Sequence, residues 1–299
     1  MTRPLLDLDP SRPPVAPVDA ATLVLIRDGA AGVEVFCVER ALESRFMGGA
    51  VVFPGGRVEP DDHDPAWRDV TGAPSTRAAA LGERTLGLAL TIAACRESLE
   101  EAAILPADRV LSHEHVLALR DTLATGAAAF RHAMHEAGLL IDLSQLVPFA
   151  RWVTPAAERR RFDARFFMVR APEGQAGAPD AHETTRSFWA RPGDVLERWE
   201  AGELQLAPPT HHTLWSLAQV HSVDEALAAA AARPLTPIHP HLVEEHETRA
   251  LTLPGDPAHP DVERLLDGPS RYVLRGERWT PEGWRDDEMT RWRDGEMAR

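Results

Sequence analysis

The sequence predicts an α+β protein in which an α/β sandwich is followed by a β-rich C-terminal addition. Two apolar runs near the N-terminus, 21–26 and 33–38, have the length of buried strands, and the segment 29–32 supplies a glycine-bounded turn between them. Helical patterns and further strand-like runs follow up to about residue 233. After Pro234 only short apolar runs occur, separated by Pro/Gly turns, which predicts short strands.

The elements of the central region follow from their apolar patterns. The longest helix is predicted over about 84–103, where Leu86, Leu90 and Ala93 recur on one face. Residues 161–170 alternate between apolar and polar side chains, which predicts a strand. The other predictions are helices at 115–125, 127–137, 192–202, 211–220 and 222–232, strands at 146–153 and 186–191, and short strands near 238, 251–253 and 272–274.

Composition suggests a division of the chain into three parts. Residues 1–19 are rich in proline and lack an apolar stretch, so we expect an extended arm and neither a signal nor a transit peptide. The core domain is expected over 20–233, and 234–299 is expected to form a β-rich extension packed on that core. No apolar run approaches the length of a membrane span, so we expect a cytoplasmic protein without membrane contact.

The charge and residue usage exclude some classes of function. A net charge of −14 argues against a general nucleic-acid binder, which needs a basic surface. All 32 basic residues are arginine, which points to a GC-rich bacterial genome and excludes a lysine nucleophile. The two cysteines, Cys37 and Cys95, fall in a predicted strand and a predicted helix, where we expect reduced packing residues.

Three carboxylates crowd the end of the longest predicted helix. Glu97, Glu100 and Glu101 stand at i, i+3 and i+4, so they share one helix face. Their mutual repulsion and the negative end of the helix dipole both disfavour this arrangement. A hard divalent cation such as Mg²⁺ or Mn²⁺ would relieve the repulsion, because these ions prefer oxygen ligands.

A glycine loop precedes this helix in the sequence. The apolar stretch 50–53 predicts a strand, and Pro54, Gly55 and Gly56 end it. Glycine lets the backbone approach a ligand closely, so this loop is the expected second half of the site.

The two segments together resemble the Nudix box, the pattern Gly-x5-Glu-x7-Arg-Glu-apolar-x-Glu-Glu-x-Gly-apolar. Gly56 matches the opening glycine and Asp62 stands in place of the first glutamate. The second half is matched by Arg96, Glu97, Glu100, Glu101 and Ile104. Ser98 and Ala103 replace an apolar residue and a glycine, and 33 residues separate Asp62 from Arg96 where the pattern has seven.

An insertion at this point, here residues 63–82, resembles the peroxisomal coenzyme A diphosphatases of animals and their bacterial relatives. The run from Glu39 to Gly56 and the segments 161–167 and 189–210 also look like that branch. The resemblance implies a Nudix-type α/β/α sandwich with a mixed sheet and a metal-dependent hydrolase. We expect the insertion to lie beside the site without supplying a metal ligand.

The resemblance also implies roles for individual residues. The metal would be Mg²⁺ or Mn²⁺, and the residues expected to hold it are Glu97, Glu100, Glu101 and the backbone at Gly56. Arg96 is counted with the catalytic residues and is expected to pair with Glu59 or Asp62, which would hold the helix and the loop together. Substrate contacts are expected from Arg40, Arg45, Arg57 and Phe46. The general base is left open among the three glutamates and a later carboxylate such as Glu183.

The expected reaction is hydrolysis of the diphosphate bond in a nucleoside-diphosphate-linked small molecule. Coenzyme A or acyl-CoA is the favoured substrate, giving 3′,5′-ADP and (acyl-)4′-phosphopantetheine. The alternatives are a pyrophosphatase for ADP-ribose, NADH or another dinucleotide, and a non-catalytic Nudix-like ligand sensor. A non-catalytic sensor can lose the three glutamates, whereas Glu97, Glu100 and Glu101 are all present here, which favours an enzyme. The oligomeric state is left open, with a homodimer as one option.

Two further clusters of residues have side chains that could form a site. The histidines between His239 and His246 have no cysteine partner, so a surface loop is expected there and not a zinc site. The triplet 159–161 could hold substrate phosphates, with Arg161 as the best candidate, but a basic triplet in an acidic protein is usually a solvated turn.

Overall fold

The structure is a computed structural model of the chain, in which residues 5–42, 47–79, 81, 84–180, 184–245 and 248–283 are described. The strands are β1 (Val18–Gly29), β2 (Gly32–Arg40), β3 (Ala50–Val52), β4 (Gly55–Arg57), β5 (Val147–Val153), β6 (Phe162–Arg170), β7 (Thr184–Ala190), β8 (Gln205–Leu206), β9 (His241–Glu245), β10 (Thr248–Thr252), β11 (Arg271–Arg275) and β12 (Arg278–Glu282).

The helices agree closely with their predicted ranges. The α-helices are α1 (Thr76–Ala79), α2 (Arg84–Ala102), α3 (His113–Ala124), α4 (Ala127–Glu136), α5 (Pro192–Glu200), α6 (Pro208–Leu217) and α7 (Val223–Ala232). Three short 3-10 helices are η1 (Pro60–His63), η2 (Pro65–Asp69) and η3 (Leu143–Gln145). These elements confirm the predicted α+β class.

Strand β1 organises the main sheet, whose order is β5-β6-β1-β2-β3-β8, with β4 added on β1 and β7 on β2. β1 runs parallel to β6 and antiparallel to β2 and β4, so the sheet is mixed, as the family resemblance implied. Its first residues pair with β4 (Ala20 with Arg57) and its last with β2 (Gly29 with Gly32). The glycine loop therefore lies at the start of β1.

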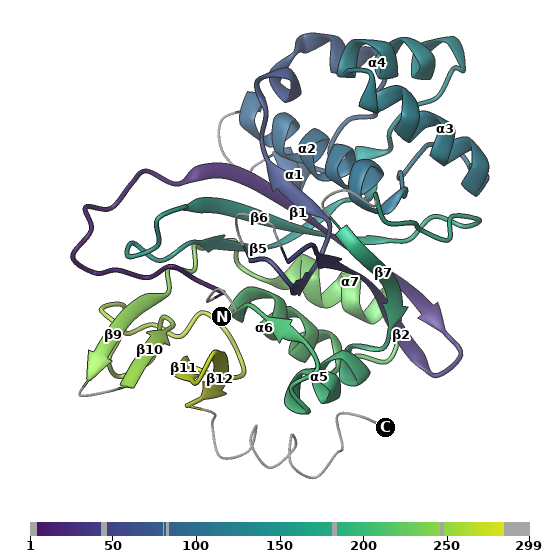
Figure 1. Cartoon of the computed structure of the whole chain (residues 1–299). Helices are drawn as coiled ribbons and strands as arrows, with labels where there is room; N and C mark the ends of the chain where they lie inside the picture. Colours follow the sequence, from purple (N-terminus) through teal and green to yellow (C-terminus); the bar gives the residue numbers. More distant parts are fainter. Residues whose placement is uncertain are drawn as a thin grey trace.

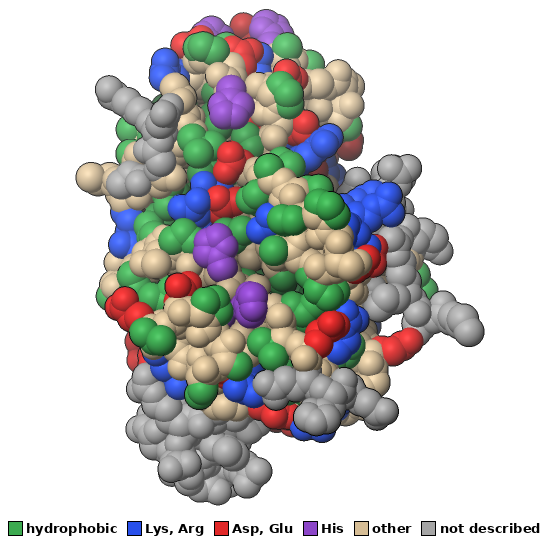
Figure 2. Space-filling view, turned by 90° about the vertical axis from the view of Figure 1, so that its left-hand side faces the viewer, with side chains coloured by type: hydrophobic (Ala, Val, Ile, Leu, Met, Phe, Trp, Pro, Cys, Tyr) green, Lys and Arg blue, Asp and Glu red, His purple; other side chains and the backbone are tan. Residues whose placement is uncertain are grey.

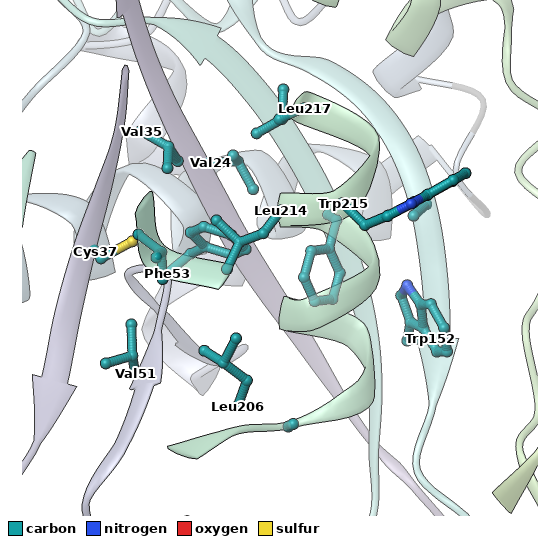
Figure 3. Packing of buried hydrophobic residues seen from close by; sticks show 14 of the residues in the cluster. Val24, Val35, Cys37, Val51, Phe53, Trp152, Leu206, Leu214, Trp215 and Leu217 are labelled. Atoms are coloured by element: carbon teal, nitrogen blue, oxygen red, sulfur yellow. The ribbon is translucent and has the colours of Figure 1, made fainter. Parts of the chain in front are cut away.

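Helices cover both faces of this sheet (Figure 1). Side chains alternate along β1, so Leu23 and Leu25 pack with α1–α4 on one face, while Val24 and Ile26 pack with α5–α7 on the other. Figure 3 shows the second face, where Leu214 of α6 lies close to Val24. The result is the three-layer sandwich expected from the sequence.

The second sheet, in the order β12-β11-β10-β9, contacts the α6 side of the sandwich (Figure 1). The Tyr272 hydroxyl lies 3.1 Å from Nδ1 of His211, and Nε2 of His212 lies 2.7 Å from the backbone oxygen of Asp267. Burial lowers the pKa of both histidines to about 3, so both are neutral packing residues at pH 7. The division of the chain at 19/20 and 233/234 stays a prediction.

One sequence prediction in this region is wrong. Residues 241–245 form strand β9, paired with β10 from His241–Thr252 to Glu245–Thr248, where a surface loop was expected. The side chains of residues 241–244 are all exposed or half-buried, so the sequence has no buried apolar pattern that would indicate a strand, and the strand is fixed by its pairing with β10.

The described part of the insertion, residues 63–79 and 81, packs on α4 through η2. It contains η2 and α1, and its Trp67 is buried against Phe130, with ring centroids 6.0 Å apart. The Trp67 indole N–H donates to the backbone oxygen of Asp61 at 2.8 Å. The Asp64 carboxylate accepts from Arg131 at 2.7 Å, so its charge is engaged away from the glutamate cluster.

Candidate active site

A cleft with a cavity volume of about 1500 Å³ brings the two halves of the motif together. Its lining includes Gly55 and Gly56 of β4 together with Glu97, Glu100 and Glu101 of α2. Figure 2 shows a face of the molecule on which acidic and basic side chains lie side by side at mid-height among hydrophobic ones. The lining of the cleft itself combines charged side chains, such as Arg40 and Glu97, with apolar ones, such as Phe53 and Phe166.

The three glutamates differ in their exposure although they share one face of α2. The side chains of Glu97 and Glu101 are 14% and 5% exposed, whereas that of Glu100 is 38% exposed. Burial raises the pKa of the Glu97 carboxyl to about 7, against the opposing effect of the neighbouring Arg96. A further cation close to Glu97 would favour its ionised form.

Arg96 ties the glycine loop to the helix. Its Nε and Nη2 donate to the two carboxylate oxygens of Asp62 at 2.9 and 3.0 Å, a bidentate pair. Its Nη1 donates to Glu97 at 2.7 Å and to Glu100 at 2.9 Å. Burial by itself would lower the pKa of Arg96. The hydrogen bonds to Asp62 and the charges of Glu97, Asp62 and Glu100 outweigh this effect and hold the pKa of Arg96 above its ordinary value.

Of the two expected partners of Arg96, the structure places Asp62 in contact. Asp62 is 1% exposed and also accepts the backbone N–H of Glu59 at 2.8 Å, which closes the first turn of η1. The Glu59 carboxylate instead accepts from the Nε of Arg57 at 2.5 Å near the surface.

Both loop glycines are required by close contacts. A Cβ atom at Gly56 would lie 2.4 Å from Oε1 of Glu97, and one at Gly55 would lie 2.6 Å from the backbone oxygen of Ala21. The Gly55 N–H donates to Oε2 of Glu101 at 3.0 Å. Glycine thus lets the loop backbone lie directly against the glutamates.

The end of α2 accounts for the two departures from the motif. Ser98 is buried, and its hydroxyl donates to the backbone oxygen of Ile104 at 2.8 Å, so a polar residue is satisfied at an apolar position. Ala103 has a φ of +50°, the left-handed conformation that terminates helices and that favours glycine. The motif glycine therefore has a backbone role that alanine performs here with strain.

The residues fit a hard divalent cation by their chemistry. The donors available in the cleft are carboxylate and backbone oxygens, which Mg²⁺ and Mn²⁺ prefer. Arg96 already places a positive group against Glu97 and Glu100, and Nη1 of Arg40 lies 3.6 Å from Glu101. As the side chains are placed, no group of three or more His, Cys, Asp or Glu in the described residues is arranged to hold a metal.

The expected substrate contacts are placed only in part. Arg40, with its side chain 19% exposed, and Arg57, 65% exposed, both line the cleft. Arg45 and Phe46 lie outside the described residues, as does Glu183, a candidate base.

Within the basic triplet 159–161, the residue that lines the cleft is not the one favoured from the sequence as a phosphate contact. The guanidinium of Arg161 donates to the backbone oxygens of Val15 and Thr154, at 2.6 and 3.1 Å, and so serves the fold. Its neighbour Arg160 lines the cleft instead.

Several cleft residues carry no signal in the sequence. They come from four separate regions of the chain and are Leu6, Arg120, Asp121, Trp152 and Leu251. Because they are distant in sequence and mostly apolar, only the folded chain shows that they share one cavity.

Comparison with known proteins identifies the family. The crystal structure of a Nudix hydrolase from Alicyclobacillus acidocaldarius is 30% identical, with a TM-score of 0.63, over 74% of this chain and 99% of that one. The chain belongs to the Nudix hydrolase family. A family model described as the NUDT19 Nudix domain matches residues 80–217 of this Nudix hydrolase, which include the glutamate-bearing half of the motif.

Curated relatives of this Nudix hydrolase point to one branch. The acyl-coenzyme A diphosphatase NUDT19 of Gallus gallus is 26% identical over 76% of this chain and 73% of its own length. The human protein of the same name is 23% identical over 94% of this chain and 83% of its own. The resemblance to the coenzyme A diphosphatase branch is thereby confirmed.

Membership of the family establishes the general chemistry. The protein is an enzyme that hydrolyses a small-molecule diphosphate, and Nudix hydrolases generally use divalent metal ions. In the part of the chain that the structure describes, no helix combines the length and the apolar character needed to cross a membrane.

Proposed function

We propose that this Nudix hydrolase cleaves the diphosphate bond of coenzyme A or acyl-CoA, giving 3′,5′-ADP and (acyl-)4′-phosphopantetheine, with Mg²⁺ or Mn²⁺ as cofactor. The relatives named acyl-coenzyme A diphosphatase support the substrate class. The observation that carries the proposal is the continuity of one cleft from the glutamate cluster to apolar walls, because coenzyme A joins a charged nucleotide to a long, less polar arm.

The metal would be held by the carboxylates of Glu97, Glu100 and Glu101 and by backbone oxygen at Gly56. When bound, it neutralises phosphate charge and lowers the pKa of a coordinated water. The guanidinium groups of Arg96 and Arg40 contact these carboxylates and offset part of the repulsion between them.

The remaining residues position the substrate and the loop. Arg40 and Arg57 line the cleft and are proposed to bind substrate phosphates, where charge-assisted hydrogen bonds are strong. Asp62 and Arg96 fix the loop that carries Gly56, so they act on the reaction through geometry. Hydrolysis adds water across the P–O–P bridge: its hydroxyl joins one phosphorus, and the bridging oxygen leaves on the other.

A substrate screen tests the proposal. Purified protein is incubated with CoA, dephospho-CoA, ADP-ribose and NADH, with Mg²⁺ or Mn²⁺ or with excess chelator, and products are identified by mass spectrometry. We expect CoA to be cut to 3′,5′-ADP and 4′-phosphopantetheine with the highest kcat/KM, and no turnover with chelator. A higher kcat/KM for ADP-ribose or NADH would overturn the substrate, and turnover in chelator would overturn the metal requirement.

A further inference from the structure

One arginine of the catalytic cleft differs from the others in its contacts. The described arginines that line the cleft are Arg40, Arg57, Arg96, Arg120 and Arg160. The first three contact carboxylates, and Arg120 donates to the backbone oxygens of Ala178 and Pro179, both at 3.2 Å. Within the described residues, the guanidinium of Arg160 makes no hydrogen bond and no ion pair, since its recorded contact is through the backbone N–H.

The hairpin between β5 and β6 carries Arg160 and has a fixed backbone. Glu158 is 3% exposed, and its carboxylate accepts the backbone N–H of Arg160 at 3.2 Å and that of Asp7 at 2.6 Å. At the base of the hairpin, the Thr154 N–H donates to the backbone oxygen of Phe162 at 2.9 Å, and the Phe162 N–H donates to the Thr154 hydroxyl at 3.0 Å. The backbone at Arg160 is therefore held in place while its side chain stays exposed.

The strand register places this hairpin at a distance from the glycine loop. Ala20 of β1 pairs with Arg57 on one side and with Ala164 on the other. Phe162 precedes Ala164 by two residues on β6, so its backbone lies about 12 Å from that of Arg57, two strand spacings across the sheet and two residues along it. Arg160 comes two residues earlier still. An anion bound by its guanidinium would therefore lie away from the diphosphate at the glutamates but within the span of one nucleotide.

The surroundings of Arg160 suit an anion. The cleft residues contributed by β1, by the β5–β6 hairpin and by β6 include no carboxylate. The carboxylates of the described lining come from the loop after β4, from α2, from α3 and from Asp180. A guanidinium presents its N–H donors in a planar fork that matches the oxygens of a phosphate. In a chain of net charge −14, this cation is placed to bind an anionic ligand.

We propose that Arg160 is a specificity-determining residue that binds a phosphomonoester on the ribose of the substrate, separate from the diphosphate that is cut. This rests on the proposed function, because CoA carries a 3′-phosphate that dephospho-CoA and ADP-ribose lack. NADPH offers the same chemistry, with its additional phosphate on the 2′ oxygen. Arg40 and Arg57 would contact the diphosphate and Arg160 the remote phosphate, so the cleft would recognise the substrate at two points.

The test compares ligands that differ by one phosphate. Calorimetry with Mg²⁺ present measures binding of 3′,5′-ADP and 5′-AMP, which contain no diphosphate to cut, to the wild type, Arg160→Ala and Arg159→Ala. Arg159 is an exposed arginine of the same hairpin that does not line the cleft, so it controls for the loss of one charge. Because both side chains are exposed, both variants should keep the Tm of the wild type.

The 3′-phosphate should strengthen binding to the wild type about tenfold to a hundredfold, the range expected for hydrogen bonds to charged groups. Arg160→Ala should remove this gap without changing the affinity for 5′-AMP, and Arg159→Ala should preserve it. A gap that survives Arg160→Ala, or that falls equally in Arg159→Ala, would overturn the assignment. Equal weakening of 5′-AMP and 3′,5′-ADP by Arg160→Ala would place this residue on the shared nucleotide and also overturn it.

Turnover separates this inference from the proposed function. The value of kcat/KM is measured for CoA against dephospho-CoA, and for NADPH against NADH, in the same three proteins. If CoA is cut and Arg160→Ala leaves the preference over dephospho-CoA unchanged, the role of Arg160 fails and the coenzyme A function stands. If no CoA compound is cut and NADPH is preferred to NADH only when Arg160 is present, the proposed function fails and the phosphomonoester subsite stands.

Discussion

The link between Asp62 and Arg96 allows the clearest test of how the loop and helix are held together. Asp62→Asn keeps the shape of the side chain and removes its charge. The bidentate pair is lost, since the amide nitrogen can only donate and faces either the guanidinium or the Glu59 N–H. In this variant Arg96 still donates hydrogen bonds to Glu97 and Glu100. The loss in free energy of unfolding is therefore smaller than for a buried guanidinium left without any charged partner.

The magnitude follows from the type of contact. Hydrogen bonds to charged groups contribute about 1.5–3 kcal/mol, so Asp62→Asn is expected to cost about 2–3 kcal/mol. This corresponds to a fall of roughly 4–10 °C in Tm. Thermal unfolding followed by circular dichroism measures it, and kcat for CoA hydrolysis should fall in the same variant because the Gly56 loop loses its anchor.

Glu59→Gln is the matched control. Its carboxylate pairs with Arg57 near the surface, where an ion pair is worth about 0–1 kcal/mol. We expect a shift in Tm under ~3 °C and nearly unchanged kcat. Equal losses in the two variants, or no loss in Asp62→Asn, would refute the assignment of Asp62 as the partner that fixes the loop.

Four further predictions follow from the site and the fold. Glu100→Gln should lower kcat by orders of magnitude with an unchanged circular dichroism spectrum, and a wild-type rate would show that this residue is a solvated surface group. Gly56→Ala should lower kcat at least tenfold with little change in Tm, because the new Cβ contacts the side chain of Glu97. In Gly55→Ala the new Cβ contacts backbone atoms, so the free energy of unfolding should fall by about 1–3 kcal/mol. The reverse pattern would contradict these glycine contacts. Ser98→Ala should cost about 1–2 kcal/mol in urea unfolding through its lost buried hydrogen bond, and no change would exclude that role. Burial lowers the pKa of His212 to about 3, so as the pH falls below 6.5 the unfolded chain takes up a proton at this histidine before the folded chain does, and the free energy of unfolding decreases. Between pH 7.5 and 5 the wild type should therefore lose about 2 kcal/mol more of this free energy than His212→Gln. Equal losses in the two proteins would contradict a neutral buried histidine.

The sequence by itself determined the local features of the site. The spacing of Glu97, Glu100 and Glu101 placed them on one helix face, and the helix was predicted within about a residue of its observed ends. The two strands that start the core and the glycine break after Phe53 also followed from local pattern. These features depend on residues close in sequence, whose periodicity reports backbone geometry directly.

Only the tertiary structure decided which distant residues meet. The choice between Glu59 and Asp62 as the partner of Arg96 depends on the turn of η1, which buries one carboxylate and leaves the other near the surface. Strands and loops that pack across the sheet also decide that Arg161 donates to backbone oxygens, that β9 pairs as a strand and that Trp152 lines the cleft. Each depends on burial and register between segments far apart in the chain, and no local pattern of side chains encodes that proximity.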